Sequence, residues 1–143
     1  GNPVRAPAAF EPGRLHRPDW YVQRDGEWRL RGSWCRRCSR LIFPAARVCS
    51  TCWPDAPDDA VLPDGGELVS WSRVEVAPEA FDPPYVIGYV DVAPGVRLFG
   101  QVDAPDEAAL TPGMRMGLVL GVIRRDADGP VWGYRFSCGG GPS

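Results

Sequence analysis

Four of the chain's five cysteines fall within one short stretch, and they carry the clearest chemistry in the sequence. They form two Cys-x-x-Cys pairs with ten residues between them, Cys35 with Cys38 and Cys49 with Cys52. In a Cys-x-x-Cys turn both sulfurs point inward and backbone N–H groups donate to them. Zinc prefers four such ligands in a tetrahedron. We therefore predict one structural Zn²⁺ site with no open coordination position for catalysis.

Other uses of the four cysteines stay open at this stage. Rubredoxin-type iron takes the same ligands, although rubredoxins space the two pairs more widely. Two disulfides or a redox-active pair are further alternatives, but nothing suggests the βαβ setting of a thioredoxin-like protein. The fifth cysteine, Cys138, lies near a glycine-rich C-terminus and is interpreted as a bystander thiol. The single histidine, His16, lies in a proline-rich arm and is expected to be solvated rather than a ligand.

No catalytic set is recognisable in the rest of the chain. The sequence contains no G-x-S-x-G motif, no Walker loop and no dinucleotide fingerprint. Its carboxylates cluster around Asp55–Asp59 and Asp103–Glu107, in stretches whose composition is typical of solvated loops. We expect that this chain is not catalytic by itself and that the reacting groups belong to a partner.

The charge and apolar patterns of the chain disfavour some classes of function. The chain has 143 residues, with 16 basic residues, all arginine, against 18 acidic ones and a net charge of −2. Nucleic-acid-binding proteins usually leave a basic footprint, so this class is disfavoured. No apolar run reaches membrane-spanning length and no signal-peptide pattern opens the sequence, so we expect a cytoplasmic protein. The chain begins with Gly rather than Met, which fits a piece of a longer protein.

The first half of the chain predicts an arm, a hairpin and a small ribbon. Residues 1–18 are rich in Pro, Ala and Arg and indicate an irregular arm. Two aromatic-rich runs then flank Asp25-Gly26, a pair suited to a tight hairpin turn. Leu41–Phe43 reads as a short strand with Arg47–Cys49 returning beside it, which would bring the two cysteine turns together. The Pro-, Asp- and Gly-rich stretch 53–66 reads as a linker.

The second half changes to strand-forming sequence. Five β-rich stretches follow one another, ELVSWSRVEVA, PYVIGYVDVA, GVRLFGQVD, MRMGLVLGVIRR and VWGYRFS. Only 105–113, between the third and fourth, has room for a short helical turn. This pattern is typical of an OB-fold barrel, with a small β-sandwich as the alternative. Glycines inside these stretches are expected to mark bulges or sharp coiling, namely Gly88, Gly100, Gly117 and Gly133.

The predicted fold class is therefore mostly β, with three parts. An N-terminal arm and hairpin would occupy 1–28, a rubredoxin-like zinc ribbon 29–60, and a five-stranded OB-fold barrel 61–143.

Two sets of side chains near the cysteines are candidates for binding. The first is basic and can meet phosphates through bidentate contacts, or can simply be a solvated surface: Arg36, Arg37, Arg40 and Arg47. The second is aromatic and either stays exposed for a protein interface or packs against the barrel: Trp34, Phe43 and Trp53. The candidate contacts to a partner or to coenzyme A are Trp34, Arg36, Arg37, Phe43, Arg47 and Trp53.

Several motifs, in order, resemble one family over roughly 28–136. They are CRRC, Phe43-Pro44 and CSTC in the ribbon, followed by GELVSWS, PPYVIGYV, GVRLFG and PGMRM in the barrel. In this order they resemble the acyl-CoA-associated zinc-ribbon/OB-fold proteins catalogued as domain of unknown function thirty-five. Family ribbons often carry glycine after each second cysteine, where this chain has Ser39 and Trp53. Family members also commonly begin with a helical arm, which Pro12 and Pro18 interrupt here.

The resemblance implies a role beside an enzyme. Such domains commonly accompany thiolase-fold enzymes, as separate subunits or fused to hydratases, and support acyl-CoA binding or bridge two enzymes. In steroid side-chain degradation, one of them pairs with a thiolase-like aldolase that cleaves a steroid acyl-CoA by a retro-aldol reaction. The rival hypothesis is a single-stranded nucleic-acid-binding OB fold. Its stacking residues would be Tyr85, Tyr89, Phe99 and Trp132, which have few arginines beside them.

Overall fold

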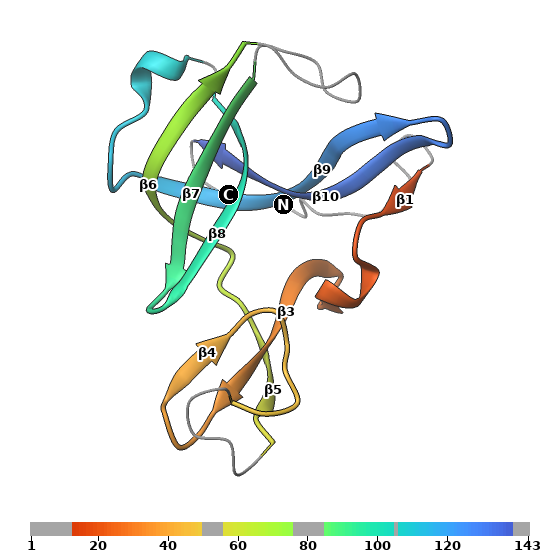
Figure 1. Cartoon of the computed structure of the whole chain (residues 1–143), viewed down its shortest axis with the longest axis vertical. Helices are drawn as coiled ribbons and strands as arrows, with labels where there is room; N and C mark the ends of the chain where they lie inside the picture. Colours follow the sequence, from red (N-terminus) through yellow and green to blue (C-terminus); the bar gives the residue numbers. More distant parts are fainter. Residues whose placement is uncertain (1–12, 50–55, 76–84, 105, 139–143) are drawn as a thin grey trace.

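The computed structural model describes residues 13–49, 56–75, 85–104 and 106–138. Strands dominate these residues, and their helical content is limited to two 3₁₀ turns, η2 (Pro18–Trp20) and η3 (Glu107–Ala109). Figure 1 shows a barrel above and a small ribbon below, with the N-terminal segment beside both. The mostly-β class predicted from the sequence is confirmed.

The barrel is built from five strands. They are β6 (Gly65–Val74), β7 (Tyr85–Ala93), β8 (Val96–Asp103), β9 (Arg115–Asp126) and β10 (Gly129–Cys138). β6, β7 and β8 pair antiparallel in sequence order, and β8 then pairs parallel with β10. β10 pairs antiparallel with β9, which returns to β6 and closes the barrel. With η3 lying between β8 and β9, this is the OB-fold arrangement that the sequence predicts.

The register shifts of the barrel do not fall at the glycines that were expected to mark bulges or sharp coiling. Register shifts occur between Leu68 and Ser70, between Asp91 and Ala93, and between Val131 and Trp132, so none of the four predicted glycines marks one. A different constraint acts at Gly100. A Cβ there would lie 3.2 Å from the rings of both Phe136 and Tyr134. The glycine therefore serves close packing of core rings against the strand rather than a bulge.

The hairpin and the ribbon share one long strand. β2 (Tyr21–Arg24) and β3 (Glu27–Cys35) pair antiparallel around Asp25-Gly26, as predicted. Both turn residues have positive φ, 53° and 80°, as a type I′ turn requires. β3 continues past the predicted boundary at 28/29 and ends at Cys35.

Two short strands flank the far half of β3. β4 (Arg40–Ile42) pairs with it on one side and β5 (Asp58–Val61) on the other. The prediction of a linker over 53–66 is wrong for 65–66, which begin β6, and for 58–61. That prediction followed composition, whereas pairing with β3 makes this segment a strand. Residues 47–49 form no strand, so the predicted return beside 41–43 is also wrong.

The described part of the arm is docked on the barrel. β1 (Arg14–Leu15) pairs parallel with β10, and the N–H of His16 donates to the Trp132 carbonyl at 2.7 Å. The arm was expected to be irregular, but backbone pairing orders these residues. Residues 1–12, including Pro12, lie outside the described residues.

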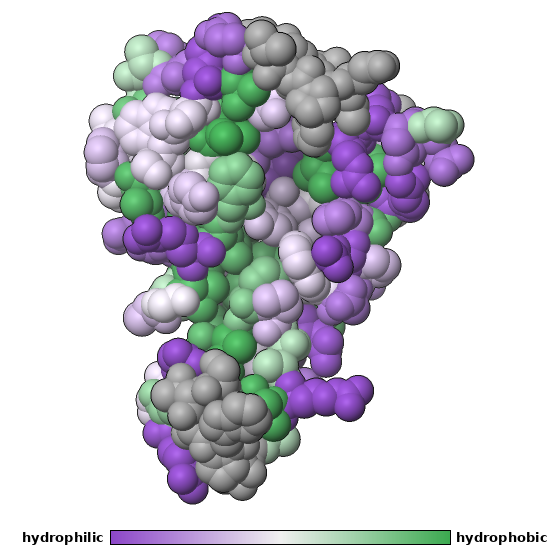
Figure 2. All heavy atoms as spheres, viewed as in Figure 1, coloured by the Kyte–Doolittle hydropathy of each residue, from purple (hydrophilic) through white to green (hydrophobic). Residues whose placement is uncertain are grey.

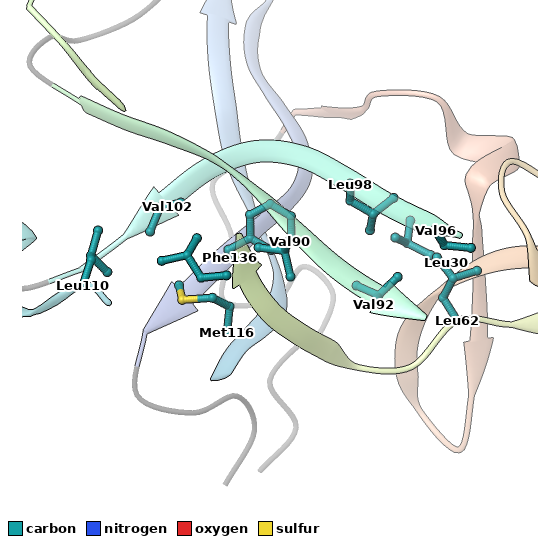
Figure 3. Close-up of a cluster of buried hydrophobic side chains, with 11 residues drawn as sticks. Leu30, Leu62, Val90, Val92, Val96, Leu98, Val102, Leu110, Met116 and Phe136 are labelled. Carbon is teal, nitrogen blue, oxygen red and sulfur yellow. The ribbon is translucent and has the colours of Figure 1, made fainter. Parts of the chain in front are cut away.

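Ribbon and barrel share one apolar core. Leu30 of β3 and Leu62, which follows β5, are 4% and 1% exposed and lie against Val92, Val96 and Leu98 of the barrel (Figure 3). The Leu62 N–H donates to the Leu30 carbonyl at 2.9 Å. Figure 2 shows apolar surface continuing from the barrel down to the ribbon. Because a buried leucine stabilises by about 1.5–3 kcal/mol, this shared core holds the two parts together.

Among the described residues, we find no helix with the length and apolar character needed to cross a membrane.

Candidate metal centre

Three cysteine sulfurs meet at the tip of the ribbon. Cys35 ends β3, Cys38 lies in the turn before β4, and Cys49 lies in the loop after it. Their sulfurs all lie within 4.8 Å of one another, and those of Cys38 and Cys49 are 3.8 Å apart. Zn–S bonds of about 2.3 Å in a tetrahedron place neighbouring sulfurs about 3.8 Å apart. A disulfide would need about 2.05 Å, so the Cys38–Cys49 geometry fits two ligands of one metal ion.

Local backbone structure explains how the first turn aims its sulfurs. The N–H of Cys38 donates to the Cys35 sulfur at 3.4 Å. Ser39 then takes φ of 52°, in the left-handed region, and the chain enters β4. The Arg40 guanidinium donates to the Cys49 sulfur at 3.7 Å. Both donors stabilise negative charge on sulfur, which metal-binding thiolates require.

The fourth predicted ligand lies outside the described residues, because Cys52 falls in 50–55. Cys52 therefore stays a prediction from the Cys-x-x-Cys spacing. The two residues not expected to be ligands lie elsewhere: Cys138 ends β10 half-buried against the barrel core. His16 was expected to be solvated but is half-buried, and its ring packs edge-on against Trp20 at 6.1 Å. Neither belongs to the sulfur cluster. Partial burial, with Arg124 and Arg17 nearby, lowers the pKa of His16 below its usual value.

Ser33 is a residue of this site that sequence reasoning missed. Its side chain is buried, 3% exposed, and its hydroxyl accepts from the Ala46 N–H at 2.9 Å and donates to the Ala46 carbonyl at 3.2 Å. Ser33 lies two residues before Cys35 on β3, so both side chains point to the same face. The spacing of two residues from Cys35 in a predicted strand was the one sequence signal that could have placed Ser33 beside the cysteines.

Several predicted contact residues remain exposed around the cluster. Trp34 is 39% exposed, and Arg37 and Arg47 are exposed with no hydrogen bond or ion pair to the described residues. Arg36 is instead ion-paired with Asp58 of β5. Val48 is 42% exposed and was not predicted. These residues leave apolar and basic groups open to a partner.

Phe43 is partly buried, so only part of its ring can contact a partner. Its ring lies 5.1 Å from that of Trp20, nearly edge-on, and Trp20 in turn lies 6.3 Å from Tyr134 of the barrel. The Phe43-Pro44 peptide bond is cis. Part of the Phe43 ring is thus committed to the junction of arm, ribbon and barrel. Trp53 lies outside the described residues.

Comparison with known proteins places this architecture in a family. Residues 60–121 match the family described as ChsH2, C-terminal OB-fold domain. The chain is 30% identical over 112 residues to a DUF35 domain-containing scaffold protein of Methanocaldococcus jannaschii, covering 75% of this chain and 79% of that protein. The chain belongs to the DUF35 family. The resemblance read from its motifs is confirmed.

Other relatives carry more specific names. The chain is 31% identical over 115 residues to benzoylsuccinyl-CoA thiolase subunit BbsA of Thauera aromatica, covering 75% of this chain and 74% of BbsA. BbsA of Geobacter metallireducens is 28% identical over 108 residues, covering 75% and 73%. The solved structure titled Ltp2-ChsH2(DUF35) aldolase shares the fold, with a TM-score of 0.58, 24% identity and coverage of 76% and 84%.

Proposed function

We propose that this DUF35 chain is a non-catalytic accessory domain that binds a thiolase-fold enzyme and supports its acyl-CoA chemistry. The observation that carries the proposal is its similarity, across three-quarters of its length, to a protein named as a thiolase subunit. The fold match to a DUF35 aldolase structure supports the same class of assembly. In this proposal the base and any nucleophile belong to the partner enzyme.

The ribbon is the proposed docking element, and zinc is its structural support. Cys35, Cys38 and Cys49, with the predicted Cys52, would hold one Zn²⁺ and order a segment too small to fold by burial alone. The shared core holds this ribbon against the barrel. The exposed Trp34, with Arg37, Arg47 and Val48, suits a partner surface because aromatic residues and arginine are enriched in interfaces.

The finer form of the proposal concerns the reaction. We propose a retro-aldol cleavage of a steroid-type acyl-CoA, with a hydratase domain fused or encoded nearby and the assembly in the cytoplasm. Its support is the family resemblance and the relatives' names, which include both a thiolase subunit and an aldolase.

One observation favours the rival function of single-stranded nucleic-acid binding. Tyr89 and Phe99, paired across β7 and β8, are 45% and 48% exposed with ring centroids 5.1 Å apart. OB folds that bind oligonucleotides use the face formed by these two strands. However, the neighbouring Arg97 is held by Asp91, and the net charge is −2. Salt-sensitive binding of oligonucleotides would favour this rival.

The test is turnover with and without the chain. The chain is co-expressed with a thiolase-fold protein encoded beside it, and cleavage of acyl-CoA is measured for the partner alone and for the complex. We expect the complex to be active and the partner alone to be impaired. Trp34→Ala should weaken co-purification, while Arg24→Ala, at an exposed position of β2, should not. Full activity from the partner alone would defeat the proposal.

A further inference from the structure

An aromatic groove opens on the barrel, away from the cysteine cluster. It has a volume of about 370 Å³ and lies between β7 and β8 on one side and β9, β10 and the arm on the other. Figure 1 shows β9 and β10 extending away from β7 and β8 on this side. Its aromatic lining comes from three separate parts of the chain: Trp20, Tyr21, Tyr85, Phe99 and Tyr134. Ligand pockets of about 300–1,000 Å³ with such a lining are typical of small-molecule sites.

Among the described residues, the groove carries the positive charge of Arg124 and no carboxylate beside it. Arg124 and His16 line it, and no Asp or Glu is among its described lining residues. Arg124 is half-buried and makes no hydrogen bond or ion pair with the described residues. Asp126 lies near enough to Arg124 for an electrostatic interaction, but both of its carboxylate oxygens accept hydrogen bonds from Arg14. A half-buried guanidinium that no described residue pairs with is costly to leave so, and an anion in the groove would offset that cost.

The wall beside Arg124 is held in place by side chains. β9 and β10 shift register here, so Ile123 has no partner opposite it on β10. The Gln101 side chain donates to the Ile123 carbonyl at 2.9 Å, and Arg135 donates to the Val122 carbonyl at 2.8 Å and to Gln101. This network fixes the groove in advance, which lowers the cost of binding.

We propose that this groove binds a flat aromatic ring that carries an anionic group. The ring would lie among the aromatic walls, where it can stack on their side chains. The anion would meet Arg124 and His16. A nucleoside phosphate and an aromatic carboxylate share this chemistry. The inference does not depend on the proposed partner, because the groove lies within one chain.

The test is calorimetric titration of the full chain with adenosine 5′-monophosphate and with 2-naphthoate. Adenosine and 2-naphthamide serve as the neutral counterparts. We expect saturable binding of at least one anion, about fivefold or more tighter than its neutral counterpart. The anion that binds shows whether the groove takes a nucleoside phosphate or an aromatic carboxylate. If neither anion binds saturably, or if the neutral compounds bind as well as the anions, the proposal is overturned.

Variants locate the binding in the groove. Arg124→Gln should weaken binding of the anion about tenfold, since it removes a charge-assisted hydrogen bond. Arg125→Gln, at the exposed neighbour, changes the net charge equally and should leave affinity within about twofold. Equal losses in both variants would show a general charge effect and overturn the site. As a readout in the unaltered chain, the pKa of His16 by NMR should rise when the anion binds, and an unchanged value would contradict the geometry.

Discussion

The Ser33 hydroxyl forms two hydrogen bonds with one residue, accepting from the Ala46 N–H at 2.9 Å and donating to the Ala46 carbonyl at 3.2 Å. Ser33 shares a face of β3 with Cys35, and Ala46 lies in the loop that leads to Cys49. One buried side chain therefore ties together the two segments that carry the sulfur cluster. The hydrogen bonds of Ser33 and the Cys49 sulfur both hold the same short loop after β4.

Replacing this tether should loosen the ribbon. Ser33→Ala leaves the Ala46 N–H and carbonyl without their partner, at an expected cost of about 1–3 kcal/mol. Native-state hydrogen exchange should show faster exchange of the β3 and β4 amides, and bound metal should pass faster to a chelating dye. Ser72→Ala, at an exposed position on β6, should change stability by less than about 0.5 kcal/mol. Equal ribbon exchange in the two variants would contradict the role of Ser33.

Ser39 offers a second prediction, because its φ of 52° is unfavourable for most side chains. Ser39→Gly should be neutral or slightly stabilising, since relief of strain offsets the greater freedom of glycine in the unfolded chain. Ser39→Val should destabilise by about 1–3 kcal/mol. Denaturant unfolding measures both, with Ser72→Val on β6 as the control that should be tolerated. Equal stability of the Ser39→Val and Ser39→Gly variants would show that the turn relaxes without strain.

Tyr134 makes the barrel sensitive to alkali. Its hydroxyl donates to the Phe99 carbonyl at 2.6 Å, and burial raises its pKa to about 12. An unfolded tyrosine ionises near pH 10. Between pH 10 and pH 12 the unfolded chain therefore loses a proton that the folded chain keeps, so the free energy of unfolding falls as pH rises. For this group the fall approaches about 1.4 kcal/mol per pH unit between these two values and fades as the pH drops below 10.

Urea unfolding at pH 8, 10, 11 and 12 tests this. Tyr134→Phe should start less stable, because the hydrogen bond to Phe99 is lost, but should show a shallower fall above pH 10. Tyr21, whose pKa burial also raises, accepts from the Tyr134 N–H and keeps titrating in that variant, so the fall should not vanish. An identical slope in Tyr134→Phe and the unaltered chain would refute the assignment.

Much of the barrel could be predicted from the sequence because its signals are local. Each strand combines β-branched and aromatic residues, and glycine or proline separates the strands. The Asp25-Gly26 turn was likewise predictable, since the two residues themselves favour positive φ. The spacing of the two cysteine pairs was enough to predict a set of metal ligands. Three of the four sulfurs lie close together in the structure, as that prediction requires.

Features that depend on distant partners could not be predicted. β5 reads as linker because Asp58 and Asp59 disfavour strands, and only pairing with β3 makes it one. Ser33 reads as an ordinary polar strand residue until Ala46 is placed beside it. The groove around Arg124 combines segments more than a hundred residues apart, so no local pattern reports it.

The central claim is that four thiolates hold one metal ion and thereby order the docking ribbon. Its most direct test is elemental analysis of the purified chain beside its Cys49→Ser variant. We predict one zinc per chain, lost in Cys49→Ser together with protection of the ribbon amides, while the barrel strands remain largely folded. A chain without bound metal whose ribbon amides are fully protected would contradict the account.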